Sequence, residues 1–179
     1  MSDYKEIKQM TVRINDVIPE SIVDGFGFRY VIFAQGCKHN CKECFNPHTH
    51  NFNAGSNVSL EMILEDIREY LDILDGVTFS GGDPFEQAPV FAELAKEIKK
   101  LGLNVWSYSG YTFEQILECP TKKLLLEEID VLVDGKFDVT KKDLKLSFRG
   151  SANQRVIDVK ESLKENKIIL INVDKKDLI

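Results

Sequence analysis

A short apolar strand followed by an amphipathic helix is the unit that recurs along this chain. Residues 28–34, FRYVIFA, are rich in β-branched and aromatic side chains and predict a buried strand. Further strands are expected at residues 77–80, 104–108 and 130–134. Because segments of helical length separate these strands, the pattern favours a mainly parallel sheet joined by right-handed crossovers.

The segments between the strands carry apolar side chains at helical spacing. The first helix is predicted to begin at Ser59, a favourable N-cap residue, and to end before Gly76. A second helix ends before Gly102, and a short helix covers residues 112–117. The apolar stripes of the two longer helices consist of Leu60, Ile63, Leu64, Ile67, Leu71 and Leu74, and of Phe91, Leu94, Ala95, Ile98 and Leu101.

The last third of the sequence is less regular. Residues 144–148 and 168–173 are expected to be strands, with a helix over residues 156–166 between them. A closed eight-stranded barrel typically needs about 250 residues, and this chain has 179. We therefore expect one α/β domain over residues 1–179 that forms a partial, open (β/α) barrel with a mainly parallel sheet. A flat doubly wound sheet is the alternative.

The composition is that of a soluble globular protein, with 43% hydrophobic and 29% charged residues. A formal net charge of −6 argues against nucleic acid as the main partner. No apolar run approaches the roughly 20 residues that span a bilayer, and the N-terminal MSDYKEIKQM lacks the pattern of a secretory signal. We expect a cytoplasmic protein, in which clustered cysteines serve metal binding or catalysis rather than disulfides.

Three of the four cysteines lie within eight positions, directly after the strand at residues 28–34. Cys37, Cys41 and Cys44 have the spacing C-x3-C-x2-C. A structural zinc site normally has four protein ligands, so a histidine or Cys119 would have to supply the fourth, and paired CxxC knuckles are missing. A cubane iron–sulfur cluster held by three thiolates, with one iron open to an exogenous ligand, suits this spacing better.

The segment SGGDP, residues 80–84, follows the next predicted strand. Glycines let a backbone approach a ligand closely, and exposed carbonyls or a carboxylate can accept hydrogen bonds from an ammonium group. The loops GCKHNCKECF, SGGDP, YSGY and DGK all follow strand ends. Because sites in such sheets gather at the carboxyl ends of strands, we expect one site there. For SGGDP alone, a turn before a helix is the alternative.

The cysteine spacing after the first strand, together with SGGDP, resembles the radical S-adenosylmethionine (SAM) enzymes. Five segments, GCKHNCKECFNPHTH, SGGDP, VWSYSGY, IDVLVDGKF and FRGSANQRVID, are together similar to the activating proteins of the anaerobic ribonucleoside-triphosphate reductase. The resemblance covers a core from about residue 25 to residue 158. It implies that Cys37, Cys41 and Cys44 hold a [4Fe-4S] cluster and that SAM binds its fourth iron.

The resemblance also implies a reaction and its partners. The reduced cluster would cleave SAM, and the resulting 5′-deoxyadenosyl radical would take a hydrogen atom from a glycine Cα of the reductase. A reduced flavodoxin is the expected electron donor. Activation of another glycyl-radical enzyme, such as one of the formate-lyase type, or action on a small molecule is the alternative within this chemistry. A zinc-stabilised interaction module is the alternative outside it.

Positions beside the third cysteine are expected, by resemblance, to lie near the adenine of SAM. Glu43 and Phe45 flank Cys44 on its two sides. Many radical SAM enzymes have an aromatic residue directly before the third cysteine, where this chain has Glu43. The apolar wall beside the adenine is then left to Phe45 or to the backbone alone.

Two further segments match SAM-binding positions of the family. Gly81, Gly82 and Asp83 match the segment that contacts the amino group of the SAM methionine. Asp134 and Lys136 resemble a D-x-K segment that glycyl-radical activases present to SAM. A strand-ending turn with a solvated lysine is the alternative for the second segment. No specific chemistry is predicted for residues 149–155, which are open to partner docking or core hydrogen bonding.

Overall fold

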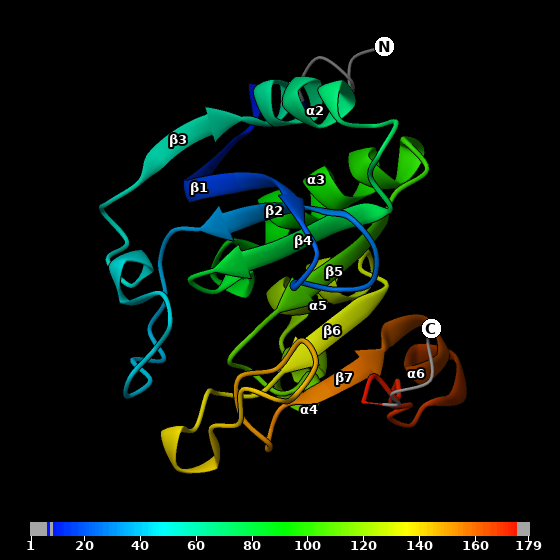
Figure 1. The fold of residues 1–179 in the computed structure, drawn as a ribbon. Coiled ribbons are helices and arrows are strands. Elements are labelled where there is room, and N and C mark those ends of the chain that lie inside the picture. The colour runs from blue at the N-terminus through cyan, green and yellow to red at the C-terminus, as the bar shows by residue number, and fades with distance from the viewer. Residues whose placement is uncertain (1–6, 8, 175–179) are drawn as a thin grey trace.

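The computed structural model describes residue 7 and residues 9–174, and it is built on a single seven-stranded sheet with the order β3-β1-β2-β4-β5-β6-β7 (Figure 1). The strands are β1 (Thr11–Ser21), β2 (Arg29–Ala34), β3 (Ser56–Ser59), β4 (Gly76–Gly81), β5 (Asn104–Tyr108), β6 (Val131–Asp134) and β7 (Arg155–Asp158). The helices are α2 (Leu60–Glu69), α3 (Ala88–Lys100), α4 (Phe113–Glu118), α5 (Pro120–Leu126) and α6 (Val159–Glu165), with 3-10 turns η1 (Pro47–Thr49), η2 (Pro84–Gln87) and η3 (Val139–Lys141). Among the described residues, no helix has both the length and the apolar character needed to cross a membrane.

The sheet is mixed, so the prediction of a mainly parallel sheet was wrong. Strands β2, β4, β5 and β6 are parallel, whereas β1 is antiparallel to β2 and β3, and β7 is antiparallel to β6. Residues 22–28 connect β1 to β2, and this connection is too short for the crossover that a parallel pair requires. The strand order leaves β3 and β7 as two edges, so the sheet is open.

The central strands and the longer helices were predicted well. Ser59 begins α2 by accepting a hydrogen bond from the Met62 backbone N–H at 3.2 Å. Helix α2 ends at Glu69, several residues before the predicted end at Gly76. Leu74 lies after the end of α2 but is buried. The apolar spacing therefore predicted its burial correctly, although this residue is not helical.

Several elements at the ends of the chain differ from the prediction. Strands β1 and β3 and helix α5 were not predicted, and residues 144–148 form turns instead of a strand. Residues 168–173 contribute an isolated bridge between Ile157 and Leu170, not a strand. The helix expected over residues 156–166 divides into β7 and α6, because the side chain of Asp158 caps the helix by accepting from the Glu161 N–H.

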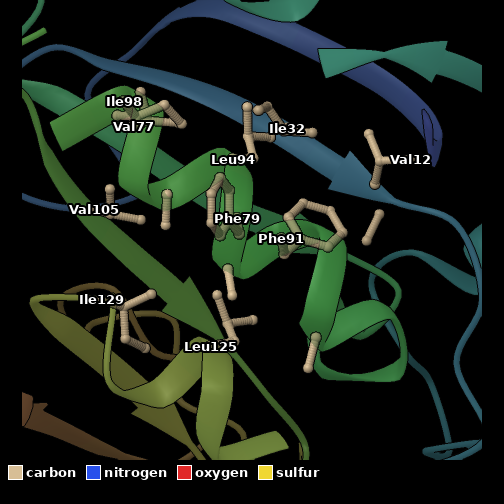
Figure 2. Packing of buried hydrophobic residues seen from close by; sticks show 14 of the residues in the cluster. Val12, Ile32, Val77, Phe79, Phe91, Leu94, Ile98, Val105, Leu125 and Ile129 are labelled. Atoms are coloured by element: carbon tan, nitrogen blue, oxygen red, sulfur yellow. The ribbon is translucent and has the colours of Figure 1, made fainter. Parts of the chain in front are cut away.

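The strands present alternate residues to two faces of the sheet, and the larger core fills the face covered by α2, α3 and α5. Figure 2 shows α3 side chains such as Phe91 and Leu94 packed against Val77 and Phe79 of β4. The opposite face carries a smaller apolar cluster formed by Trp106, Val131, Val133 and Val156, with Tyr108, Phe148, Ile171 and Val173 packed against it. The helices therefore occupy one face and leave the other to loops.

Two adjacent leucines of α5 provide a test of this core. Leu125 is fully buried, whereas Leu124 is 48% exposed. Leu125→Ala should lower the free energy of unfolding by about 2–5 kcal/mol, because it removes buried methyl groups and leaves a cavity. Leu124→Ala, the matched control, should cost less than about 1 kcal/mol. Urea denaturation of both variants measures the difference, and equal losses would show that α5 does not pack as described.

Candidate functional site

The three clustered cysteines line one cavity of about 540 Å³ at the carboxyl ends of the parallel strands. Their loop is closed by backbone hydrogen bonds: the Gly36 N–H donates to the Thr49 carbonyl at 2.7 Å, and the Cys37 N–H donates to the His50 carbonyl at 3.2 Å. The Cys44 N–H donates to the Cys41 carbonyl at 3.2 Å. All three thiols are free and half-buried. The loop therefore holds them along one cavity wall without a disulfide.

The protein by itself disfavours the ionised form of two of the three thiols. Burial raises the pKa of Cys37 to about 11 and also raises the pKa of Cys41. Metal ligation requires the thiolate, so a cationic centre must offset this effect. In the described part of the chain, no three His, Cys, Asp or Glu side chains converge as ligands of one metal ion. A cluster instead places each thiolate on a different iron, which suits three cysteines distributed along one wall.

The SGGDP loop leaves the sheet directly beside the cysteine loop, because Ala34 of β2 pairs in register with Gly81 of β4. Gly81 has a φ of +93°, and a Cβ there would lie 2.6 Å from the Ala34 nitrogen. A Cβ on Gly82 would lie 2.5 Å from the Gly36 carbonyl oxygen. Both positions require glycine because the backbone of β2 passes close to Gly81 and the backbone of the cysteine loop passes close to Gly82. Both glycines also line the cavity, so their backbone is available to a ligand.

The carboxylate of Asp83 joins three separate loops. It lies 2.7 Å from His39 Nε2 and accepts hydrogen bonds from the Ser109 hydroxyl at 3.0 Å and the Gly110 N–H at 3.0 Å. It also accepts from the Phe85 N–H at 2.9 Å, which begins η2. Asp83 is only 1% exposed. Its oxygens are therefore engaged by the protein itself, and the residue holds the cysteine loop, the loop after β5 and η2 together.

The two residues that flank Cys44 differ in their position relative to the cavity. Phe45 lines the cavity, with its ring centroid 4.9 Å from that of Phe137. Glu43 is exposed, has a φ of 56°, and is not one of the described residues that line the cavity. The structure therefore brings Phe45 to the cavity and leaves Glu43 at the surface.

The segment after β6 reaches the cavity through Gly135, which lines it between Asp134 and Lys136. Asp134 is buried and accepts a hydrogen bond from Arg155 Nε at 2.9 Å. Arg155 also pairs with Glu114 at 2.8 Å, and this hydrogen bonding lowers the pKa of Glu114 to about 2. Lys136 is exposed, and its charge acts to lower the pKa of Cys41 against the effect of burial. Its ammonium group therefore lies within electrostatic reach of Cys41.

Other cavity residues were missed by the sequence analysis. Asp24 lies in the loop between β1 and β2, which carried no recognisable motif, and Tyr108 ends β5. Gln154 lies in the segment to which no chemistry was assigned, and its side chain donates to the Gly135 carbonyl at 3.0 Å. His39 was considered only as a zinc ligand, whereas it contacts Asp83. The resemblance of residues 148–158 to the family was the one signal that pointed to Gln154.

Comparisons with known proteins identify the family of this chain. A protein-family model described as "4Fe-4S single cluster domain" matches residues 23–157. The anaerobic ribonucleoside-triphosphate reductase-activating protein of Pasteurella multocida (strain Pm70) is 36% identical over 143 residues, which cover 76% of this chain and 90% of the relative. The protein of the same name from Vibrio cholerae serotype O1 is also 36% identical, over 76% of this chain and 91% of the relative.

Among solved structures, QueE from Escherichia coli superposes with a TM-score of 0.50 at 19% identity. The match covers 63% of this chain and 58% of that one, and it supports the fold alone. The two sequence relatives share a higher identity with this chain than QueE does, and their alignments with it cover 90% and 91% of their own lengths. The chain therefore belongs both to the 4Fe-4S single cluster domain family and to the family of anaerobic ribonucleoside-triphosphate reductase-activating proteins.

Proposed function

We propose that this protein is a radical SAM activase that generates a glycyl radical on the anaerobic ribonucleoside-triphosphate reductase. One observation carries the proposal: three cysteines and the Gly81–Gly82 backbone face one cavity in a chain whose relatives are named activators of that reductase. The cavity of about 540 Å³ is within the range of about 300–1,000 Å³ usual for small-molecule sites. The open sheet then serves as the wall of a partial (β/α) barrel.

Cys37, Cys41 and Cys44 would hold a [4Fe-4S] cluster, and SAM would occupy the adjoining part of the cavity. When bound, the reduced cluster supplies the electron that splits a carbon–sulfur bond of SAM, giving methionine and a 5′-deoxyadenosyl radical. The backbone of Gly81 and Gly82 would receive the methionine end of SAM, since no side chain there blocks the approach. Phe45 would provide an apolar wall beside the adenine.

The other residues predicted to bind SAM would contribute indirectly, by positioning loops of the cavity or by adding charge near it. Asp83 keeps the SGGDP and cysteine loops together, although its own carboxylate is buried. Asp134, paired with Arg155, positions the turn that brings Gly135 to the cavity. Lys136 adds positive charge near Cys41. Glu43 at the surface would contribute at most through its backbone.

This chemistry also indicates the substrate, the electron donor and the cellular compartment. The proposed substrate is a glycine residue of the reductase, which would lose a hydrogen atom from its Cα to the 5′-deoxyadenosyl radical and so be oxidised to a glycyl radical, with 5′-deoxyadenosine as the other product. We propose that the protein acts in the cytoplasm and that a carrier such as reduced flavodoxin supplies the electron. The competing function is activation of a formate-lyase type enzyme. It would use the same residues for the cluster and SAM but a different protein substrate.

The cluster assignment predicts the effect of single cysteine substitutions. Cys37→Ala, Cys41→Ala and Cys44→Ala should each abolish SAM cleavage and lower the bound iron after anaerobic reconstitution, because each removes one of three anchors. Cys119, at the junction of α4 and α5, is the matched control. Cys119→Ala should retain both the SAM cleavage and the bound iron of the wild type. An active Cys41→Ala protein, or one zinc per wild-type chain in place of iron, would refute the assignment.

The partner is tested by electron paramagnetic resonance. The reduced protein, mixed with SAM and the anaerobic reductase, should give the doublet of a glycyl radical. A formate-lyase type enzyme under the same conditions should give none. A doublet with the second enzyme alone would move the function to that partner while leaving the chemistry of the site intact.

The positioning role of Asp83 predicts a loss of stability. Asp83→Ala would leave buried donors on Ser109, Gly110 and Phe85 without an acceptor, and we expect a loss of about 3 kcal/mol or more in the free energy of unfolding. Asp72→Ala, at an exposed position after α2, should change it by less than about 0.5 kcal/mol. If Asp83→Ala were as stable as this control but had a raised KM for SAM, Asp83 would instead contact SAM directly.

A further inference from the structure

We propose that the mouth of the cavity is a docking surface for an acidic segment of the reductase's glycyl-radical subunit. This proposal rests on the proposed function and adds the chemistry by which the partner is recognised. The surface combines exposed apolar side chains with a basic segment, defined here as residues 136–150. Both parts surround the cavity that holds the cysteines.

The apolar part of the mouth comes from three separate loops. Val23 follows β1, Phe45 belongs to the cysteine loop, and Leu144 lies in the basic segment; all three line the cavity. Their exposed fractions are 70%, 54% and 78%. Large apolar side chains gathered in this way at the rim of a cavity mark an interaction site more often than isolated ones do.

The basic segment has a charge opposite to that of the whole chain. It carries two acidic side chains, Asp138 and Asp143, against five basic ones, in a chain of formal charge −6. Two of the basic side chains are paired, since Lys141 contacts Asp138 and Arg149 contacts Asp174. The three without a carboxylate partner within the described part of the chain are Lys136, Lys142 and Lys145.

The basic segment is held in place even though it has little regular structure. The ring of Phe148 packs edge-on against Trp106 at 5.4 Å and Phe26 at 5.2 Å. The side chain of Gln154 accepts from the Gly150 N–H at 2.9 Å and donates to the Gly135 carbonyl at 3.0 Å. The lysines are therefore presented from an anchored support, which reduces the ordering cost of binding.

Outside the basic segment the chain carries more acidic than basic side chains. Helix α2, for example, carries Glu61, Glu65, Asp66 and Glu69 against one basic residue, Arg68. A positive mouth on a negatively charged molecule directs an acidic segment toward the cavity and disfavours other approaches. In Figure 1 the loop after β2 and the start of the basic segment after β6 lie at the same side of the sheet. A segment bound across both would pass over the cavity between them.

The proposal is tested by reversing the charge of two lysines. Lys142 and Lys145 are exposed and neither lines the cavity, and Lys142 Nζ lies 5.4 Å from the ring centroid of Phe45 at the rim. In the double variant K142E/K145E, we expect the KM for the reductase to rise about tenfold or more, because charges at the rim govern the association rate. The rate of SAM cleavage without the reductase should remain that of the wild type. The glycyl-radical doublet, followed against reductase concentration, gives the KM.

The matched control is K164E/K167E on and just after α6. Because β7 runs antiparallel to β6, α6 begins beside the start of β6, at the end of the sheet opposite the cavity. This double variant has the same change of charge and should leave the KM for the reductase within twofold of the wild type. The apolar part of the mouth is tested in the same assay by Leu144→Ala, which should also raise the KM, and by Leu124→Ala on α5, which should not.

The outcomes separate this proposal from the proposed function. If the wild type forms no radical on the reductase, the function itself fails and the named partner falls with it. If the wild type forms the radical but K142E/K145E has the same KM as K164E/K167E, the function stands and the docking surface is refuted. Light scattering provides the third outcome: a wild-type dimer that K142E/K145E converts to a monomer would show that the mouth binds a second copy, which also overturns the proposal.

Discussion

The buried carboxylate of Asp83 is the interaction on which the arrangement of the site depends. A carboxylate removed from water is costly unless hydrogen-bond donors surround it. Here the donors come from the loop after β5 and from the start of η2, and His39 of the cysteine loop contacts the same carboxylate. None of these loops can shift alone without leaving polar groups buried and without partners. The three loops are therefore held together as one unit, and the position of the cysteine loop depends on a side chain outside the proposed set of cluster ligands.

The parts of the fold that could be predicted are those whose sequence carries a local signal of burial. Strand β2 is buried on both faces, so residues 30–34 form a continuous apolar run, as is usual for strands covered on both sides. Strand β1 was missed because its exposed residues include Asp16 and Glu20 and only one of its faces packs on the core. Helix α5 was also missed, although it begins at Pro120 and proline is favoured in the first turn of a helix.

The candidate site also has features that the sequence could predict and features that it could not. The cysteine spacing and the two glycines are local features, and because both directly follow apolar strands, the sequence was enough to predict that they share one edge of the sheet. The direction of a carboxylate is not a local feature. Asp83 lies 44 positions from His39 and 26 from Ser109, so its partners are set by tertiary packing. The same holds for Arg155, whose contacts with Asp134 and Glu114 span 21 and 41 positions.

The exposure of the cavity bears on the kind of substrate. A carbon radical must be kept from water and from side reactions, which requires the site to be closed when the radical forms. Within the described residues, the helices cover the opposite face of the sheet, while the cavity mouth is bordered by exposed side chains such as Val23 and Leu144. Closure must therefore come from outside the described residues. Under the proposed function, a polypeptide substrate inserted across the mouth would supply both the reacting glycine and the missing cover, so an open cavity is the form that a protein substrate requires.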